Sequence, residues 1–305
     1  MLEFIGRRTL HSIIALTTLI VLVFFLGRLT GDPALLYLPE NATKKTIEDF
    51  RERNGFNDPI LVQFGRYVEG AAHLDFGKSY RRNQPAMQVV VEALPWTLKL
   101  AAVTVVLAML VAMTVGPLAA YRPASIFDRI ASVLSLAAAS TPDFWVAIIG
   151  ILVIAVQFGW LPTSGVGGPA YWVLPIFVLM LKITGTTTQV VRGSMISTLA
   201  SPYIKAARAK GMQEERIVFI HALRNSVIAA VTVAGDQTRG IVNGAVIVET
   251  VFGWPGIGKT MIDAITQRDF AVIQAAVLVT AVIILALNIV IDILYALLDP
   301  RIRLN

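Results

Sequence analysis

Long apolar stretches, separated by short polar ones, make up most of this chain. Six of them reach or exceed the roughly 20 residues that a helix needs to cross the hydrocarbon core of a membrane. Their apolar residues follow one another without the alternation of a half-buried strand, which favours helices. The predicted spans are residues 10–29, 96–120, 131–158, 172–191, 226–252 and 271–297, with a kink or break expected at Pro142 in the third.

The composition agrees with a membrane protein. Hydrophobic residues make up 56% of the 305 residues and charged residues 15%, with a mean hydropathy of +0.70. Soluble domains are about 45–50% apolar and about 25% charged, so a soluble fold would have too little polar surface to cover these side chains. The chain has no cysteine, which excludes disulfides, thiolate metal sites and cysteine nucleophiles.

The positions of Lys and Arg predict the orientation in the membrane. If six spans are counted, both termini lie on one side, and that side carries twelve Lys and Arg residues. The two short loops on the other side carry only Lys259 and Arg268. The longer segment 30–95 holds eight more, but long loops cross membranes largely regardless of charge. We therefore expect cytoplasmic termini and an external segment 30–95.

The first span could alternatively be a cleaved signal peptide, because it begins with Arg7 and Arg8. The apolar run is long for a signal peptide, and the residues after it, Gly27-Arg28-Leu29, do not form a small-x-small cleavage site. An uncleaved span is the better interpretation. The expected organisation is a cytoplasmic N-terminus and first span over 1–29, an external helical subdomain over 30–95, and five spans over 96–305.

The external segment contains signals for two short helices. Thr43 is a candidate N-cap for a helix over 43–53, and residues 55–59, Gly-Phe-Asn-Asp-Pro, are typical of a turn. A second helix is expected over 60–70. No repeat or low-complexity tract is evident.

The loop 192–225, between spans four and five, contains a well-delimited short helix. Ser201 is a favourable N-cap, Pro202 suits the first helical position, and Gly211 is typical of a helix end. The small residues Ala206 and Ala207 would let another surface approach the backbone closely. On these observations alone, a docking helix and a helix lying on anionic lipid both remain open. A second short helix is expected from near Gln213; it carries Ile217, Val218 and Ile220.

One segment matches the phosphate-binding P-loop pattern GxxxxGK[ST] of ATPases. It is residues 253–260, Gly-Trp-Pro-Gly-Ile-Gly-Lys-Thr. A P-loop requires a preceding strand and backbone amides that surround a phosphate. Here a predicted transmembrane helix precedes the motif, Pro255 lacks an amide proton, and the topology places the motif outside. We interpret the segment as a Gly/Pro turn rather than a nucleotide site.

Several polar residues occur within the predicted spans, where an ionisable group is costly and therefore suggests function. Asp236 and Arg239 are three residues apart and could pair on one helix face. The pair is either a packing element or part of a polar translocation path for a zwitterionic solute. The candidate path residues are Asp236, Gln237, Arg239, Asn243 and Gln189. Lys182, Thr186–Thr188 and Asp143 are weaker candidates, and Asp292, near the cytoplasmic end of span six, is expected to anchor a helix end.

No enzyme signature is present. The three histidines, His11, His73 and His221, do not share the spacing of metal ligands, and there is no Gly-x-Ser-x-Gly elbow. We therefore predict no catalytic residue and no metal site.

The helix of the 192–225 loop resembles the EAA loop of the permeases of binding-protein-dependent ABC importers. The resemblance rests on Ala206-Ala207-x-x-x-Gly211, and the continuation 221–225, His-Ala-Leu-Arg-Asn, is similar to the dipeptide/oligopeptide/nickel branch. The chain departs from the broad family in having Lys205 in place of Glu and no Pro near Arg224. Further matching motifs occur in order: Asp32-Pro33, Gly55-Phe56-x-Asp58-Pro59, Asp75-Phe76-Gly77-x-Ser79, Pro142-x-Phe144-Trp145, Leu161-Pro162-x-Ser164-Gly165, Glu249-x-x-Phe252-x-x-Pro255-Gly256-Ile257-Gly258, Arg268-Asp269 and Asp292-x-x-Tyr295-x-x-x-Asp299-Pro300-Arg301.

This resemblance implies an all-α permease with six transmembrane helices in the bacterial cytoplasmic (inner) membrane. The 201–211 helix would be the coupling helix that docks on an ATP-binding subunit, and the turn with Pro255, Gly256 and Gly258 an external gate element. The expected coupling residues are Tyr203, Lys205, Ala206, Ala207, Arg208, Lys210 and Gly211.

The implied partners are a second homologous permease, identical or different, two ATP-binding subunits, an external solute-binding protein and the lipid bilayer, with no nucleic acid. ATP and magnesium would be bound by the partners, and this chain would bind no cofactor. The implied substrates are di- or oligopeptides, with nickel chelates, glutathione or opine-like solutes as alternatives. A stand-alone secondary transporter, for which we see no inverted repeat, and a scaffold without a path are the rival functions.

Overall fold

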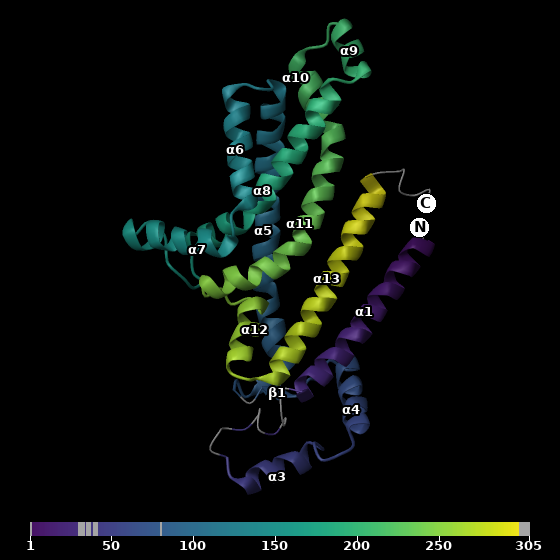
Figure 1. The fold of residues 1–305 in the computed structure, drawn as a ribbon, viewed down its shortest axis with the longest axis vertical. Coiled ribbons are helices and arrows are strands. Elements are labelled where there is room, and N and C mark those ends of the chain that lie inside the picture. The colour runs from purple at the N-terminus through teal and green to yellow at the C-terminus, as the bar shows by residue number, and fades with distance from the viewer. Residues whose placement is uncertain (1, 30–33, 35–37, 39–41, 80, 299–305) are drawn as a thin grey trace. The chain divides into compact units, whose positions relative to one another are not determined.

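The computed structural model describes residues 2–29, 34, 38, 42–79 and 81–298, and nearly all of the regular structure in it is helical (Figure 1). The chain divides into two compact units. The first comprises residues 1–97 and 255–289, and the second residues 98–254 and 290–305. Each unit is described separately below.

Four helices in the described part of the chain are long and apolar enough to cross a membrane. They are α1 (Leu2–Leu29), α5 (Ala86–Tyr121), α8 (Ala170–Leu199) and α13 (Phe270–Leu298). Two bent helix pairs bring the number to as many as six if each pair counts as one span. The prediction of a helical membrane protein is thereby confirmed.

The break expected at Pro142 in the third predicted span, 131–158, is confirmed. α6 (Ile126–Ser140) ends before Pro142, and α7 (Asp143–Gly150) continues into the π-helical segment η1 (Ile151–Gln157). The two halves are bent by 102°. Thr141 and Pro142 are both extended, with ψ of 131° and 134°, because a proline disfavours helical backbone in the residue before it. Pro142 therefore turns the chain rather than only kinking a helix.

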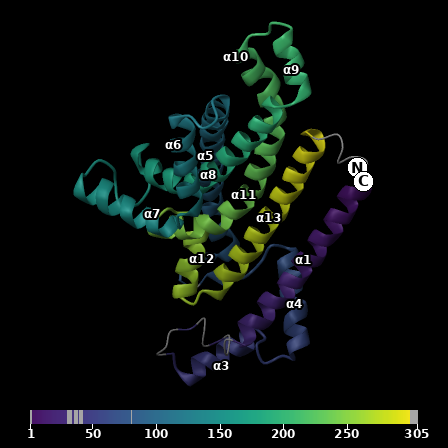
Figure 2. The ribbon, with the colours of Figure 1, turned by 45° about the horizontal axis from the view of Figure 1, so that its top comes forward.

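The second bent pair follows the short helix α9 (Pro202–Ala209). α10 (Glu214–Arg216) continues through the π-helical segment η2 (Ile217–Ala222) into α11 (Leu223–Val251), with a bend of 46°. Because α8 extends to Leu199, only a short stretch of the 192–225 loop lies outside these long helices. Figures 1 and 2 show α9 and α10 beyond the ends of α8 and α11.

The first unit contains the two short helices that the sequence predicted. α3 (Lys44–Arg53) begins at Thr43, whose hydroxyl accepts from the Thr46 amide, and α4 (Ile60–Ala72) follows the turn at Gly55, which has φ of +64°. The sequence analysis missed a two-stranded antiparallel ladder of β1 (Lys78–Ser79) and β2 (Gln84–Pro85), and it missed α12 (Ile257–Thr266). Buried residues from α4, α5, α12 and α13 form the core of this unit.

In the second unit, α8 packs against both α6 and α11. The approach to α6 is very close at Gly185, where an added Cβ would lie 2.4 Å from the Ser135 carbonyl oxygen and 2.8 Å from the Ala139 nitrogen. The approach to α5 is close at Gly116, where a Cβ would lie 2.7 Å from a methyl carbon of Val191. Glycine at these two positions allows the backbones to approach without a clash.

Candidate functional site

The helix α9 begins and ends where the sequence predicted. Ser201 occupies the N-cap position with extended backbone, and Pro202 is the first helical residue. The Ser201 hydroxyl does not cap the helix; it donates instead to the Thr198 carbonyl at 2.6 Å. Gly211 has φ of +80°, which a residue with a side chain rarely adopts, and it ends the helical hydrogen bonding.

Only one side of α9 is held by the rest of the unit. Ile204 is completely buried, whereas Tyr203, Lys205, Ala206 and Arg208 are exposed. Lys210 and Gly211 are also exposed, and Ala207 is half-buried. The helix thus presents a surface of small and basic residues, and the buried side chain of Ile204 holds its other side against the unit.

The turn after α9 is closed by an ion pair. The Arg208 guanidinium donates to both carboxylate oxygens of Glu214, with Nε–Oε1 and Nη2–Oε2 distances of 2.5 and 3.3 Å. The Gly211 amide also donates to the Arg208 carbonyl at 2.9 Å. The bidentate ion pair joins the end of α9 to the start of α10 and restricts the angle between the two helices.

Beyond this turn, buried apolar residues connect the loop to the long helices. Val218 and Ala222 of η2 pack in one cluster with Val191 and Met195 of α8 and with Ala230 of α11. The Ser226 hydroxyl of α11 donates to that of Ser194 at 3.1 Å. The segment that follows α9 is therefore closely packed against α8 and α11, with little room for independent movement.

An ion pair that the sequence analysis missed joins α6 to α8. Asp128 is almost fully buried and accepts from Arg192, with an Nη2–Oδ2 distance of 2.8 Å and a second contact from Nε. The Ala124 amide also donates to Asp128 at 2.8 Å, and Ser125 caps α6. The pattern Ser125-x-x-Asp128 was a signal for the helix start, but its partner is 64 residues away in the sequence.

The structure places the candidate path residues in different environments. The Gln237 amide donates to the Thr186 hydroxyl of α8 at 3.1 Å, and the Gln189 amide donates to the Ser132 carbonyl of α6 at 3.0 Å. Asp236 is exposed on α11. The side chains of Arg239, Asn243 and Asp292 lie outside the described residues, so their pairing stays a prediction. Gln189 and Gln237 thus connect neighbouring helices.

The turn after α11 is fixed by backbone hydrogen bonds. The Phe252 carbonyl accepts from the Gly165 amide at 2.8 Å, and the Trp254 amide donates to the Glu249 carbonyl at 2.7 Å. The ring of Trp254 is fully buried and meets that of Trp172 edge to face, with centroids 4.6 Å apart. Further along, Gly256 and Gly258 are buried and Pro255 is half-buried.

The apparent P-loop at 253–260 has none of the required geometry. A helix precedes it, and the first amide of α12, that of Ile257, donates to the Thr97 hydroxyl at 2.9 Å. The Lys259 ammonium binds Asp263 at 2.5 Å, and Thr260 is buried. An amide and a lysine that should contact phosphate are thus both engaged within the protein.

We therefore expect Lys259→Ala to leave any nucleotide-dependent activity unchanged. A true P-loop lysine contacts the β- and γ-phosphates, and its loss would abolish such activity. Here the substitution removes only a partly exposed ion pair within one helix, which is worth about 0.3–0.5 kcal/mol. Comparing ATP-driven uptake by the wild type and the variant checks the expectation; a large loss would restore the nucleotide-site interpretation.

No group of three His, Cys, Asp or Glu residues capable of holding a metal ion occurs in the portion of the chain that the structure describes. Of the sequence motifs quoted above, Asp32-Pro33 and Asp299-Pro300-Arg301 fall outside that portion.

Comparison with known families decides what kind of protein carries this loop. Residues 105–304 match the family described as the binding-protein-dependent transport system inner membrane component. Residues 1–101 match the N-terminal region of the membrane components of the same systems. The chain belongs to this permease family. It is therefore a multi-pass membrane component of a transport system, and the family is not one of catalytic enzymes.

Individual permeases resemble this one along its whole length. An oligopeptide transport system permease protein, AppB, of Bacillus subtilis is 36% identical over 315 residues, covering 99% of this permease and 100% of the relative. The dipeptide permease DppB of Alkalihalophilus pseudofirmus is 32% identical, covering 99% and 100%. The glutathione permease GsiC of Escherichia coli is 34% identical, with 99% of each chain covered.

Proposed function

We propose that this permease is the membrane-spanning subunit of an ATP-driven importer of short peptides. The observation that carries the proposal is full-length similarity, at 32–36% identity, to permeases named for oligopeptide and dipeptide transport. The similarity to a glutathione permease is compatible, because glutathione is itself a small peptide. Nickel chelates and opine-like solutes are the alternative substrates.

The proposed topology has six spans, with each bent pair counted as one. Both termini and the α9 loop would face the cytoplasm, because Lys and Arg accumulate there, and α3 and α4 would lie outside. The family description, an inner membrane component, supports placement in the bacterial cytoplasmic membrane.

In this arrangement α9 is the coupling helix. Its exposed small and basic residues would dock on an ATP-binding subunit, and closure of two such subunits would displace the helix. The buried contacts of Val218 and Ala222 support transmission of that displacement to α8 and α11. ATP and magnesium are held by the partner subunits, and this chain contributes no nucleotide site or other cofactor.

The proposed solute path lies between this permease and a second homologous one, identical or different. Asp236, Gln237, Arg239, Asn243 and Gln189 are the candidate residues along it, and Pro255, Gly256 and Gly258 form the external gate turn. A separate solute-binding protein would deliver the peptide from outside. The ion pair of Asp128 with Arg192 would hold α6 and α8 together while the path opens.

The test is reconstitution of the permease in proteoliposomes with its partner permease, ATP-binding subunits and binding protein. Uptake of radiolabelled L-alanyl-L-phenylalanine should require enclosed ATP and should be reduced by unlabelled dipeptides. Peptide uptake by the permease alone under an ion gradient would refute the proposal in favour of a secondary transporter. Competition by a nickel chelate, but not by dipeptides, would refute the substrate assignment.

A further inference from the structure

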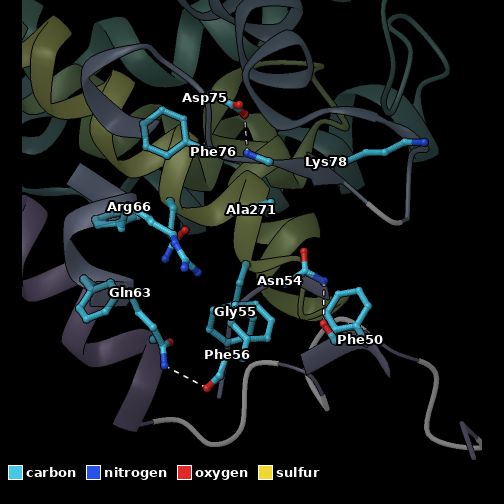
Figure 3. Close-up of a pocket in the computed structure, with 16 residues that line it drawn as sticks. Phe50, Asn54, Gly55, Phe56, Gln63, Arg66, Asp75, Phe76, Lys78 and Ala271 are labelled. Carbon is cyan, nitrogen blue, oxygen red and sulfur yellow. Dashed lines mark hydrogen bonds between the residues drawn. The ribbon is translucent and has the colours of Figure 1, made fainter. Parts of the chain in front are cut away.

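A cavity of about 320 Å³ lies within the first unit (Figure 3). Its walls come from the end of the apolar window in α1, from α3, α4 and the turn between them, from the segment before β1, and from the start of α13. Cavities that bind small ligands have volumes of about 300–1,000 Å³, so this one suits a small solute.

Aromatic side chains form much of the wall. The ring of Tyr67 lies between those of Phe24 and Phe76, with centroid distances of 5.5 and 6.5 Å. Phe50 and Phe56 are a second pair, 5.9 Å apart. Such rings provide a large apolar surface for a side chain or a flat group of a ligand.

Two glycines in the wall have different effects on the cavity. Gly27 of α1 lines it, and an added Cβ there would make only ordinary contacts, at 3.7 Å from the Gln274 amide nitrogen and 3.9 Å from Phe270. At Gly55 a Cβ would lie 1.8 Å from a guanidinium nitrogen of Arg66, so the absence of a side chain leaves that space to Arg66. A longer side chain at position 27 would therefore extend into space that is now empty.

Two buried polar atoms in the wall have no hydrogen-bond partner among the residues that the structure describes. They are the hydroxyl oxygen of Tyr67 and the Oε1 oxygen of Gln63, one helical turn apart on α4. The Gln63 amide nitrogen is already engaged with the carbonyls of Phe56 and Asp58, at 3.0 and 2.7 Å, which fixes the direction of the oxygen (Figure 3). A buried polar group without a partner costs about 1–3 kcal/mol, and a ligand could satisfy both.

The protonation state of Tyr67 is also defined. Burial raises the pKa of its hydroxyl to about 12, so the group is neutral throughout the physiological range and retains its proton for donation. Gln63 Oε1 accepts only. Tyr67 and Gln63 thus contribute one hydrogen-bond donor and one acceptor, from positions one helical turn apart on α4.

Charged groups of both signs line the same cavity. Arg66 forms an ion pair with Asp58 at 2.6 Å, and Lys78 is an exposed cation at the start of β1. Asp75 is exposed and accepts from the Gly77 amide at 2.9 Å (Figure 3). A ligand carrying both an ammonium and a carboxylate would find an opposite charge for each.

We propose that this cavity binds a free short peptide of dipeptide size. A peptide bond supplies an N–H for Gln63 Oε1 and a carbonyl for the Tyr67 hydroxyl. An apolar side chain of the peptide would pack on the rings, and its terminal charges would face Asp75 and the cations Arg66 and Lys78. The proposal rests on the proposed peptide-import function and adds a second peptide site, built from residues other than the candidate path residues.

The experiment uses the full-length permease in lipid nanodiscs, labelled with 3-fluorotyrosine and titrated with L-alanyl-L-phenylalanine. The fluorine resonance of Tyr67, assigned by its disappearance in Tyr67→Phe, should shift and saturate. In equilibrium dialysis, Tyr67→Phe should bind the dipeptide about two- to tenfold more weakly, the loss expected for one hydrogen bond. Its melting temperature should not fall, because the hydroxyl that it removes has no described partner.

Two further variants make the test specific. Gly27→Leu should fill the cavity and abolish the shift of Tyr67. Leu61→Ala, at an exposed position on α4, the helix of Tyr67, should change neither binding nor the spectrum. Wild-type affinity in both Tyr67→Phe and Gly27→Leu would overturn the proposal. It would also be overturned if glycerophosphoglycerol, a soluble lipid headgroup, shifted Tyr67 and the dipeptide did not.

The test of this peptide site and the test of the proposed import function can fail independently of each other. ATP-driven dipeptide uptake by the reconstituted importer, with no saturable shift of Tyr67, would refute this site and leave the import function intact. A saturable shift without any ATP-driven uptake would refute the import function and leave the site intact.

Discussion

An Ala207→Trp permease is expected to insert and assemble normally but to lose ATP-driven uptake almost completely. Position 207 is half-buried, next to the exposed small residues Ala206 and Gly211, so an indole ring there would enlarge this surface of α9. Because Ile204 fixes the back of α9, the helix cannot retreat to make room. A docked ATP-binding subunit would be held several ångströms away, and the movement that it delivers would be lost. Uptake of labelled dipeptide in proteoliposomes measures the effect.

The control is the same large side chain on an exposed apolar face, Leu134→Trp on α6, which should keep most of the uptake. Gly211→Pro should reproduce the loss by another route, because proline cannot adopt the φ of +80° found there and has no amide for the Arg208 carbonyl. Normal uptake in both Ala207→Trp and Gly211→Pro would show that α9 is not the coupling helix.

Gly185→Leu is expected to prevent stable folding of the second unit. Even the Cβ would lie 2.4 Å from a backbone oxygen and 2.8 Å from a backbone nitrogen of α6, and backbone atoms cannot rotate away as a side chain can. Overpacking typically lowers the free energy of unfolding by about 1–3 kcal/mol, and a clash with backbone atoms is expected to cost about 3 kcal/mol or more. Separation of α6 from α8 would also disturb the buried pair of Asp128 and Arg192. The thermal unfolding midpoint in detergent should fall steeply, or the protein should aggregate on size exclusion.

The matched control lies on the same helix. A Cβ at Gly193 would meet nothing within 4 Å, so Gly193→Ala should leave the midpoint unchanged or raise it, since alanine is favoured over glycine in helices by about 1 kcal/mol. Equal midpoints for Gly185→Leu and Gly193→Ala would contradict the close approach of α6 and α8.

The features that the sequence predicted correctly are those encoded locally. Ser201, Pro202 and Gly211 delimit α9, and Thr43 marks the start of α3, because caps and turns depend on a few adjacent residues. The four long apolar helices α1, α5, α8 and α13 followed from continuous apolar runs. Pro142 predicted a break in the helix. The angle of 102° between α6 and α7 depends on how the two helices pack, and no local sequence pattern encodes that packing.

The features that the sequence did not predict depend on contacts between distant segments. The first amide of α12 is satisfied by Thr97, 160 residues away, so its Gly/Pro-rich start looked like an open turn. The cavity beside Tyr67 needs walls from α1, α4 and α13. Gln189 and Gln237 were found as polar residues in apolar runs, but periodicity could not reveal that each bonds to another helix.

The π-helical segment η2 has a consequence for the evolution of the coupling loop. α10, η2 and α11 follow one another without a break in the helical backbone, so inserting or deleting one residue between Glu214 and Leu223 would turn α9 about the axis of α11, by up to the roughly 100° that separates successive residues of an α-helix. The exposed face of α9 would then point away from its present direction, even if every side chain on it were retained. Selection should therefore conserve the length of this connection as strictly as its composition, and natural variation between these positions should consist of substitutions rather than gaps.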